Sequence, residues 1–122
     1  MLKSPEVISA YERVDRADFV TGDAEPYQDA AAVMGFGAQV SAPHVHCAAL
    51  ELIQEKASSL SSVSSLRVLD LGSGSGCMAT LLARLVEGRG HVLALEHIQE
   101  LVVLAQRNVA KQNQELVRSE TL

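Results

Sequence analysis

The stretch that decides the fold is LRVLDLGSGSG, residues 66–76. Its first six residues form a short apolar run of the kind that builds a buried strand, and three alternating glycines follow. Because glycine has no Cβ, the backbone can turn sharply there and a ligand can approach the main chain closely. The stretch therefore predicts a strand that runs directly into a ligand-binding loop.

The residues after this loop predict a helix, a second strand and a second helix. Apolar residues recur at helical spacing between Met78 and Val86, and Gly88 stands where that helix would end. Residues 91–96 are typical of a strand, and apolar positions between Ile98 and Val109 indicate the next helix. Strands that are joined through a helix lie parallel, so residues 66–112 predict a β-α-β-α unit of an α/β fold.

The N-terminal residues predict a helix that begins at Pro5. Ser4 supplies a capping hydroxyl, and proline loses no hydrogen bond at the first helical position. The apolar positions of this helix are Val7, Ile8, Tyr11 and Val14. Farther along the chain, Gly35 and Gly37 exclude a stable helix and favour a turn or a close approach of the backbone.

A further helix restarts at residues 41–43 and ends near Ala57. Its apolar positions at helical spacing are Val45, Ala49, Leu52 and Ile53. Serines crowd into residues 58–65, which predicts a polar connector, and the polar residues 113–122 predict a solvated helix end or a frayed tail. The chain thus divides into an N-terminal region (1–57), the connector (58–65), the β-α-β-α unit (66–112) and the tail (113–122).

Composition and charge set the broad class of the protein. The chain has 122 residues, a formal net charge of −5, 48% hydrophobic residues and 20% charged residues. These values exclude an intrinsically disordered chain and a basic nucleic-acid-binding domain. No apolar run approaches the roughly 18 residues of a membrane helix, and the first residues lack the apolar stretch of a secretory signal, so we expect a cytoplasmic protein without a membrane partner.

The cysteines and neighbouring histidines do not indicate a metal site. Cys47 and Cys77 have neither metal-ligand spacing nor the density of a disulfide scaffold, so we expect reduced, unreactive thiols. His44 and His46 point to different faces of a helix, which argues against their ligating one metal ion.

The glycine loop and the acid at the end of the second strand indicate a nucleoside ligand. The helix after the loop presents free N–H groups and the positive end of its dipole to a polar ligand. Glu96 follows the glycines by about 20 residues, and an acid at that point can accept both hydroxyls of a ribose.

The spacing of the glycines separates two classes of nucleoside cofactor. It is G-x-G-x-G instead of the dinucleotide pattern G-x-G-x-x-G, and Asp70 precedes the loop. This combination resembles the first motif of the class I S-adenosylmethionine-dependent methyltransferases, and the acidic residues suit a sulfonium cation. Two alternatives remain open: glycines that serve only tight packing, and a fragment of a nicotinamide-dependent dehydrogenase.

A second constellation, GFGAQVSAPHVH at residues 35–46, resembles the signature of the protein-L-isoaspartate (D-aspartate) O-methyltransferases. Residues 3–20 are similar to that family's N-terminal helix with its Asp-Arg turn. Pro26-Tyr27 matches a pair in the family, and residues 96–102 match its second-strand segment. The resemblance extends over nearly the whole chain.

The resemblance implies methyl transfer from S-adenosylmethionine to the α-carboxylate of L-isoaspartyl residues in damaged proteins and peptides. Ser41 matches the hydroxyl that holds the substrate carboxylate. The residues that match the cofactor site are Ala38, Gln39, Val40, Ser41, His46, Asp70, Gly72, Ser73, Gly74, Glu96 and His97. A simpler reading of Ser41, as the cap of the helix that begins near Pro43, stays open.

The sequence also departs from the family. The family fold is a Rossmann-like, doubly wound sheet of seven strands, and this sequence supplies the N-terminal helices and the first β-α-β-α unit. Two parallel strands with open edges expose apolar surface and unpaired backbone groups. We therefore expect a truncated chain with impaired activity; the alternative is an inactive remnant that binds a nucleoside or a partner.

Overall fold

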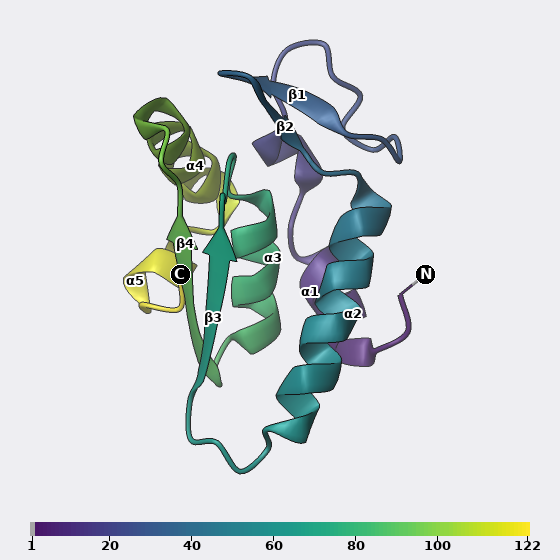
Figure 1. Ribbon diagram of the computed structural model, residues 1–122, viewed down its shortest axis with the longest axis vertical. Coiled ribbons are helices and arrows are strands. Elements are labelled where there is room, and N and C mark those ends of the chain that lie inside the picture. Colours follow the sequence, from purple (N-terminus) through teal and green to yellow (C-terminus); the bar gives the residue numbers. More distant parts are fainter. Residues whose placement is uncertain (1) are drawn as a thin grey trace.

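The computed structural model describes residues 2–122, and its main sheet forms from the two strands that the sequence predicts. β3 (Leu66–Leu71) and β4 (Gly90–Leu95) pair in parallel, with Leu66 opposite Gly90 and Leu71 opposite Leu95 (Figure 1). The helix α3 (Cys77–Val86) connects the strands and α4 (Gln99–Gln112) follows β4. The β-α-β-α prediction is confirmed.

One face of this sheet is covered and the other is bare. α3 packs between the sheet and the N-terminal helices, so its residues are almost all buried (Figure 1). The opposite face exposes apolar side chains, namely Leu69, Leu71, Leu93 and Leu95. Alternate residues of a strand point to opposite faces, so this pattern is what a half-covered sheet produces. The prediction that the two strands expose apolar surface is confirmed.

The prediction of a solvated or frayed end at residues 113–122 is partly wrong, since several residues there are exposed but the segment is docked. This segment contains the short helix α5 (Gln114–Arg118), and Asn113 and Leu116 are fully buried. The buried Arg84 donates from Nε to Asn113 Oδ1 at 3.1 Å, and the N–H of Val92 donates to the carbonyl of Thr121 at 2.7 Å. The segment docks because it satisfies polar groups of α3 and of the outer edge of β4.

The N-terminal half forms α1 (Pro5–Glu12), the short 3-10 helix η1 (Arg16–Phe19) and α2 (Pro43–Ser59). Pro5 opens α1 as predicted, but Ser4 does not cap it with its side chain. Instead the Ser4 hydroxyl donates to Glu51 at 2.6 Å, and the Ser4 N–H donates to the same carboxylate. The N–H of Lys3 also donates to Glu51, and this hydrogen bond together with those from Ser4 lowers the pKa of Glu51 and fastens the start of α1 to α2.

A short antiparallel hairpin precedes α2, and the sequence analysis missed its strands. β1 (Ala32–Gly35) pairs with β2 (Ala38–Val40). The predicted turn is there: Gly35, Phe36 and Gly37 all have positive φ angles, 88°, 56° and 71°. Strands of four and three residues hold too few positions for an alternating pattern to be recognised.

The apolar face predicted for α2 is partly wrong, since Val45 and Leu52 are exposed while Leu50 is fully buried. α2 packs on α1 and α3 through a face that is rotated from the predicted one. The connector begins two residues later than predicted, because α2 continues to Ser59. No helix within residues 2–122 has the length and apolar character to cross a membrane.

Gly90 is required by a close approach between the strands. A Cβ at Gly90 would lie 2.4 Å from the carbonyl oxygen of Leu66, whereas a Cβ at Gly88 would meet nothing within 4 Å. We expect Gly90→Ala to lower the free energy of unfolding by about 3 kcal/mol, because the backbone of β3 cannot move away without breaking the pairing. In Gly88→Ala the only cost is that alanine must adopt a positive φ of 78°, so this variant should lower the free energy of unfolding by about 1 kcal/mol. Urea denaturation of both variants checks this, and equal losses would contradict it.

Candidate functional site

The glycine loop between β3 and α3 has a backbone that only glycine adopts readily. Gly72, Gly74 and Gly76 have φ angles of 80°, 53° and 89°. Gly74 is also approached by the hairpin, since a Cβ there would lie 2.9 Å from the terminal methyl group of Met34. The loop therefore leaves its main chain open for a ligand on one side and is contacted by β1 on the other.

Glu96 fixes this loop to the end of β4. Its Oε2 accepts the N–H of Gly74 at 2.9 Å, and its Oε1 accepts the N–H groups of His97 and Ile98 at 2.9 and 3.1 Å. These backbone hydrogen bonds hold the pKa of Glu96 below its usual value. Glu96 is therefore a fixed, ionised acceptor at the carboxyl edge of the sheet.

Asp70 is the second acid of the site and has the opposite electrostatic environment. Burial and the neighbouring charge of Glu96 raise its pKa. Its Oδ2 is buried and has no hydrogen-bond partner among the described residues. A ligand that brings a positive charge into the neighbouring space would stabilise the ionised form of this carboxyl.

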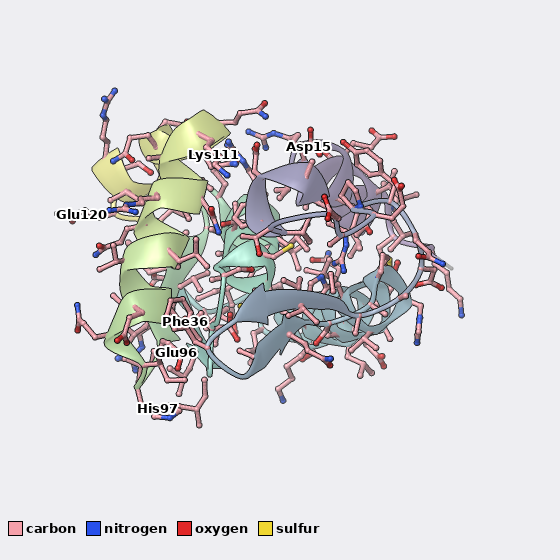
Figure 2. All side chains as sticks on the ribbon, turned by 90° about the horizontal axis from the view of Figure 1, so that it is seen from above. Asp15, Phe36, Glu96, His97, Lys111 and Glu120 are labelled. Atoms are coloured by element: carbon pink, nitrogen blue, oxygen red, sulfur yellow. The ribbon has the colours of Figure 1, made fainter. Side chains whose placement is uncertain are left out.

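A cavity of about 320 Å³ brings the predicted site residues together. Those that line it are Ala38, Gln39, Val40, Ser41, His46, Asp70, Gly72, Ser73, Gly74 and Glu96. His97 does not: its side chain is 89% exposed, and Figure 2 shows it pointing away from the rest of the molecule, close to Glu96. The structure thus gathers residues from β2, α2, β3, the glycine loop and the segment just after β4 at one place.

The hairpin β1–β2 supplies one wall of the cavity and extends over the carboxyl ends of β3 and β4 (Figures 1 and 2). The sequence analysis named Ala38 to Ser41 here but missed Met34, and it also missed Val45 and Met78 from the two helices. Recognition of β1 as a strand would have identified Met34, since alternation places it on the same face as Ala32.

Ser41 does not cap α2, so that simpler reading of it is wrong. The first residue before α2 is Ala42. The N–H of His44 is accepted by Asp29 Oδ1 at 3.0 Å, and the same oxygen lies 2.9 Å from His44 Nδ1. These contacts lower the pKa of Asp29, and its carboxylate provides the acceptor for a free backbone N–H in the first turn of α2. Ser41 is exposed and lines the cavity.

His46 and Cys77 are neighbours that stay uncharged. The Cys77 Sγ lies 3.9 Å from His46 Nδ1. Burial lowers the pKa of His46 to about 4 and raises the pKa of Cys77 to about 12. A thiolate–imidazolium pair is therefore disfavoured at neutral pH, in agreement with the expectation of an unreactive thiol.

The parallel strands, the glycine loop after the first of them and the acid after the second form an edge of the kind at which α/β proteins bind nucleosides. A chain from Plasmodium falciparum, described as a protein-L-isoaspartate O-methyltransferase and solved in complex with S-adenosyl-L-homocysteine, matches with a TM-score of 0.83 and 25% identity. The match covers 98% of this chain and 54% of that chain. The fold is that of the class I, S-adenosylmethionine-dependent methyltransferases.

Residues 1–121 match the protein-L-isoaspartate(D-aspartate) O-methyltransferase family, and the chain belongs to that family. A protein-L-isoaspartate O-methyltransferase from Caenorhabditis elegans is 38% identical over 112 residues, which are 92% of this chain and 47% of the relative. Protein-L-isoaspartate O-methyltransferase 1 from Arabidopsis thaliana is 36% identical over 109 residues, 89% of this chain and 45% of the relative. The chain spans about half the length of the curated relatives it matches.

Proposed function

We propose that this chain binds S-adenosylmethionine and positions the α-carboxylate of an L-isoaspartyl residue for methylation, as part of a protein-repair methyltransferase. The observation that carries the proposal is the shared cavity, which Ser41 from the N-terminal half lines together with the glycine loop and Glu96 from the β-α-β-α unit. Family membership over residues 1–121 supports the same reading.

The residues of the cavity fit this cofactor. The glycines leave the main chain of the loop accessible, and the carboxylate of Glu96 can accept further hydrogen bonds from ribose hydroxyls. The buried Oδ2 of Asp70 lacks a partner among residues 2–122, and S-adenosylmethionine carries positive charge on its sulfonium and amino groups. Two acids that face one cavity suit such a cation.

In the proposed mechanism the chain contributes alignment and exclusion of water. When bound, S-adenosylmethionine supplies an electrophilic methyl group. A carboxylate has a reference pKa near 4, so the nucleophile is already ionised and needs no general base. The Ser41 hydroxyl donates a hydrogen bond to the substrate carboxylate and holds its attacking oxygen in line, while Met34 and Val45 give the cavity an apolar wall.

A thermal melt of the purified chain with saturating S-adenosyl-L-homocysteine tests the binding step. A ligand that binds only the folded state raises the midpoint, by an amount that grows with its concentration above the dissociation constant. We expect a cooperative transition that moves upward with S-adenosyl-L-homocysteine and not with NAD. Absence of a shift, or a shift with NAD alone, would contradict the proposal.

Methylation of an isoaspartyl peptide, with the aspartyl peptide as the control, tests the catalytic step. A second candidate function is nucleoside or partner binding without turnover, which the bare leucine face of the sheet favours because it leaves the fold half covered. An upward shift of the melt without methylation would support that candidate.

We place the protein in the cytosol, since Cys47 and Cys77 are free thiols.

A further inference from the structure

Arg16 lies at the base of the hairpin β1–β2 and bonds to both of its ends. Its Nη1 donates to the carbonyl oxygen of Ser41 at 2.8 Å, and its Nη2 donates to the carbonyl oxygen of Ala30 at 3.2 Å. Ala30 comes just before β1 and Ser41 comes just after β2. A single guanidinium therefore joins the two points at which the chain enters and leaves the hairpin.

The hairpin depends on such a support. Its strands have only four and three residues, and an isolated two-stranded hairpin is at best marginally stable in water. Arg16 is only 7% exposed, and its Nε has no hydrogen-bond partner among the described residues. A buried charged group without hydrogen-bond partners is costly. The two hydrogen bonds from Arg16 to the carbonyl oxygens are therefore strongly favoured over a state in which they are broken.

We propose that Arg16 is a positioning residue, which clamps the base of the hairpin and thereby sets the place of Ser41 and of the cavity wall formed by residues 38–41. Where it concerns ligands, this inference rests on the proposed function. The planar guanidinium can donate to two carbonyls at once from fixed directions, which the ammonium of lysine cannot reproduce. Without the clamp, a smaller fraction of the molecules has the hairpin in its binding position. The apparent affinity for the ligand falls in proportion to this fraction.

Arg84 provides a matched control. It is also a buried arginine, 8% exposed, and its guanidinium donates to Asn113 Oδ1, but it holds α5 and takes no part in lining the cavity. Arg84→Met therefore removes a buried guanidinium at a different place, one that also pairs with the carboxylates of Glu87 and Glu115. It separates an effect on the hairpin from a general loss of stability.

The experiment compares Arg16→Met, Arg16→Lys and Arg84→Met by hydrogen exchange with mass spectrometry and by titration with S-adenosyl-L-homocysteine. For Arg16→Met we expect exchange about tenfold faster in peptides covering residues 30–42, with binding weakened about tenfold. Arg16→Lys should lie between this variant and the wild type. Arg84→Met should speed exchange at residues 113–122 and leave both the hairpin and the affinity within about twofold of the wild type.

Unchanged hairpin exchange in both Arg16 variants would overturn the inference, and so would an equal loss of affinity in Arg84→Met. If Arg16→Met does not fold, Arg16→Lys decides by the same two measurements. If the wild-type chain does not bind S-adenosyl-L-homocysteine, the proposed function fails, while the exchange of residues 30–42 still decides whether Arg16 holds the hairpin.

Discussion

Glu96→Gln is expected to weaken the binding of S-adenosyl-L-homocysteine by at least about tenfold. The carboxylate of Glu96 accepts three backbone N–H groups, from Gly74, His97 and Ile98, and a glutamine would turn an NH₂ group toward at least one of these donors. The variant loses the charged acceptor that we propose for the ribose hydroxyls, and it also releases the glycine loop from the end of β4. Isothermal titration of the two proteins measures the change.

Glu100→Gln is the control for this variant. Glu100 lies in the first turn of α4, is exposed, and does not line the cavity, so its replacement removes the same charge nearby without touching the loop. Its affinity should match that of the wild type. Equal affinities of Glu96→Gln and Glu100→Gln for S-adenosyl-L-homocysteine would mean that Glu96 does not hold the ligand.

The pH dependence of binding follows from the lowered pKa of Glu96. A carboxyl group whose pKa is lowered in the folded protein stays ionised until the pH falls below its usual range. The acceptor therefore stays more highly ionised than an ordinary glutamate as the pH falls from about 7 to about 5, and Glu96 should contribute little loss of affinity there. Asp70, whose pKa is raised by burial and by the charge of Glu96, takes up a proton at a higher pH than an ordinary aspartate does.

The β-α-β-α unit could be predicted from the sequence because each of its elements carries a local signal. The strand at residues 66–71 is a continuous apolar run, the glycines at 72, 74 and 76 punctuate it, and the next helix repeats apolar residues at helical spacing. These signals also placed Asp70 and Glu96 at the edge where the cavity lies, since the carboxyl ends of parallel strands share one edge of the sheet.

The parts that could not be predicted depend on residues far apart in the sequence. Ser4 and Ser41 both satisfy the local rule for a helix cap. In the structure, Glu51 accepts the N–H of Ser4 at the start of α1, and Asp29 accepts the N–H of His44 at the start of α2. The docking of residues 113–122 depends on Arg84, a charged residue on an apolar helix. In each case a tertiary hydrogen bond decides the local structure, and local patterns carry no information about it.

Ser41→Ala is expected to lower kcat/KM for an isoaspartyl peptide by about 100-fold and to leave the affinity for S-adenosyl-L-homocysteine unchanged. Alanine keeps the backbone that lines the cavity and the carbonyl that accepts from Arg16, so the hairpin stays in place. What disappears is the hydroxyl that would hold the substrate carboxylate in line with the methyl group. Initial rates at a saturating methyl donor, together with a titration of the product cofactor, measure the two effects separately.

Ser64→Ala and Ser41→Thr complete this comparison. Ser64 is an exposed serine of the connector and does not line the cavity, so its loss should change neither quantity. Threonine retains the hydroxyl at position 41, and we expect it to recover part of the rate. If Ser41→Ala methylates the peptide as fast as the wild type, the hydroxyl does not position the substrate. If it loses cofactor affinity as well as rate, the side chain acts on the hairpin wall instead of on the carboxylate, and the division of roles between Ser41 and Glu96 is wrong.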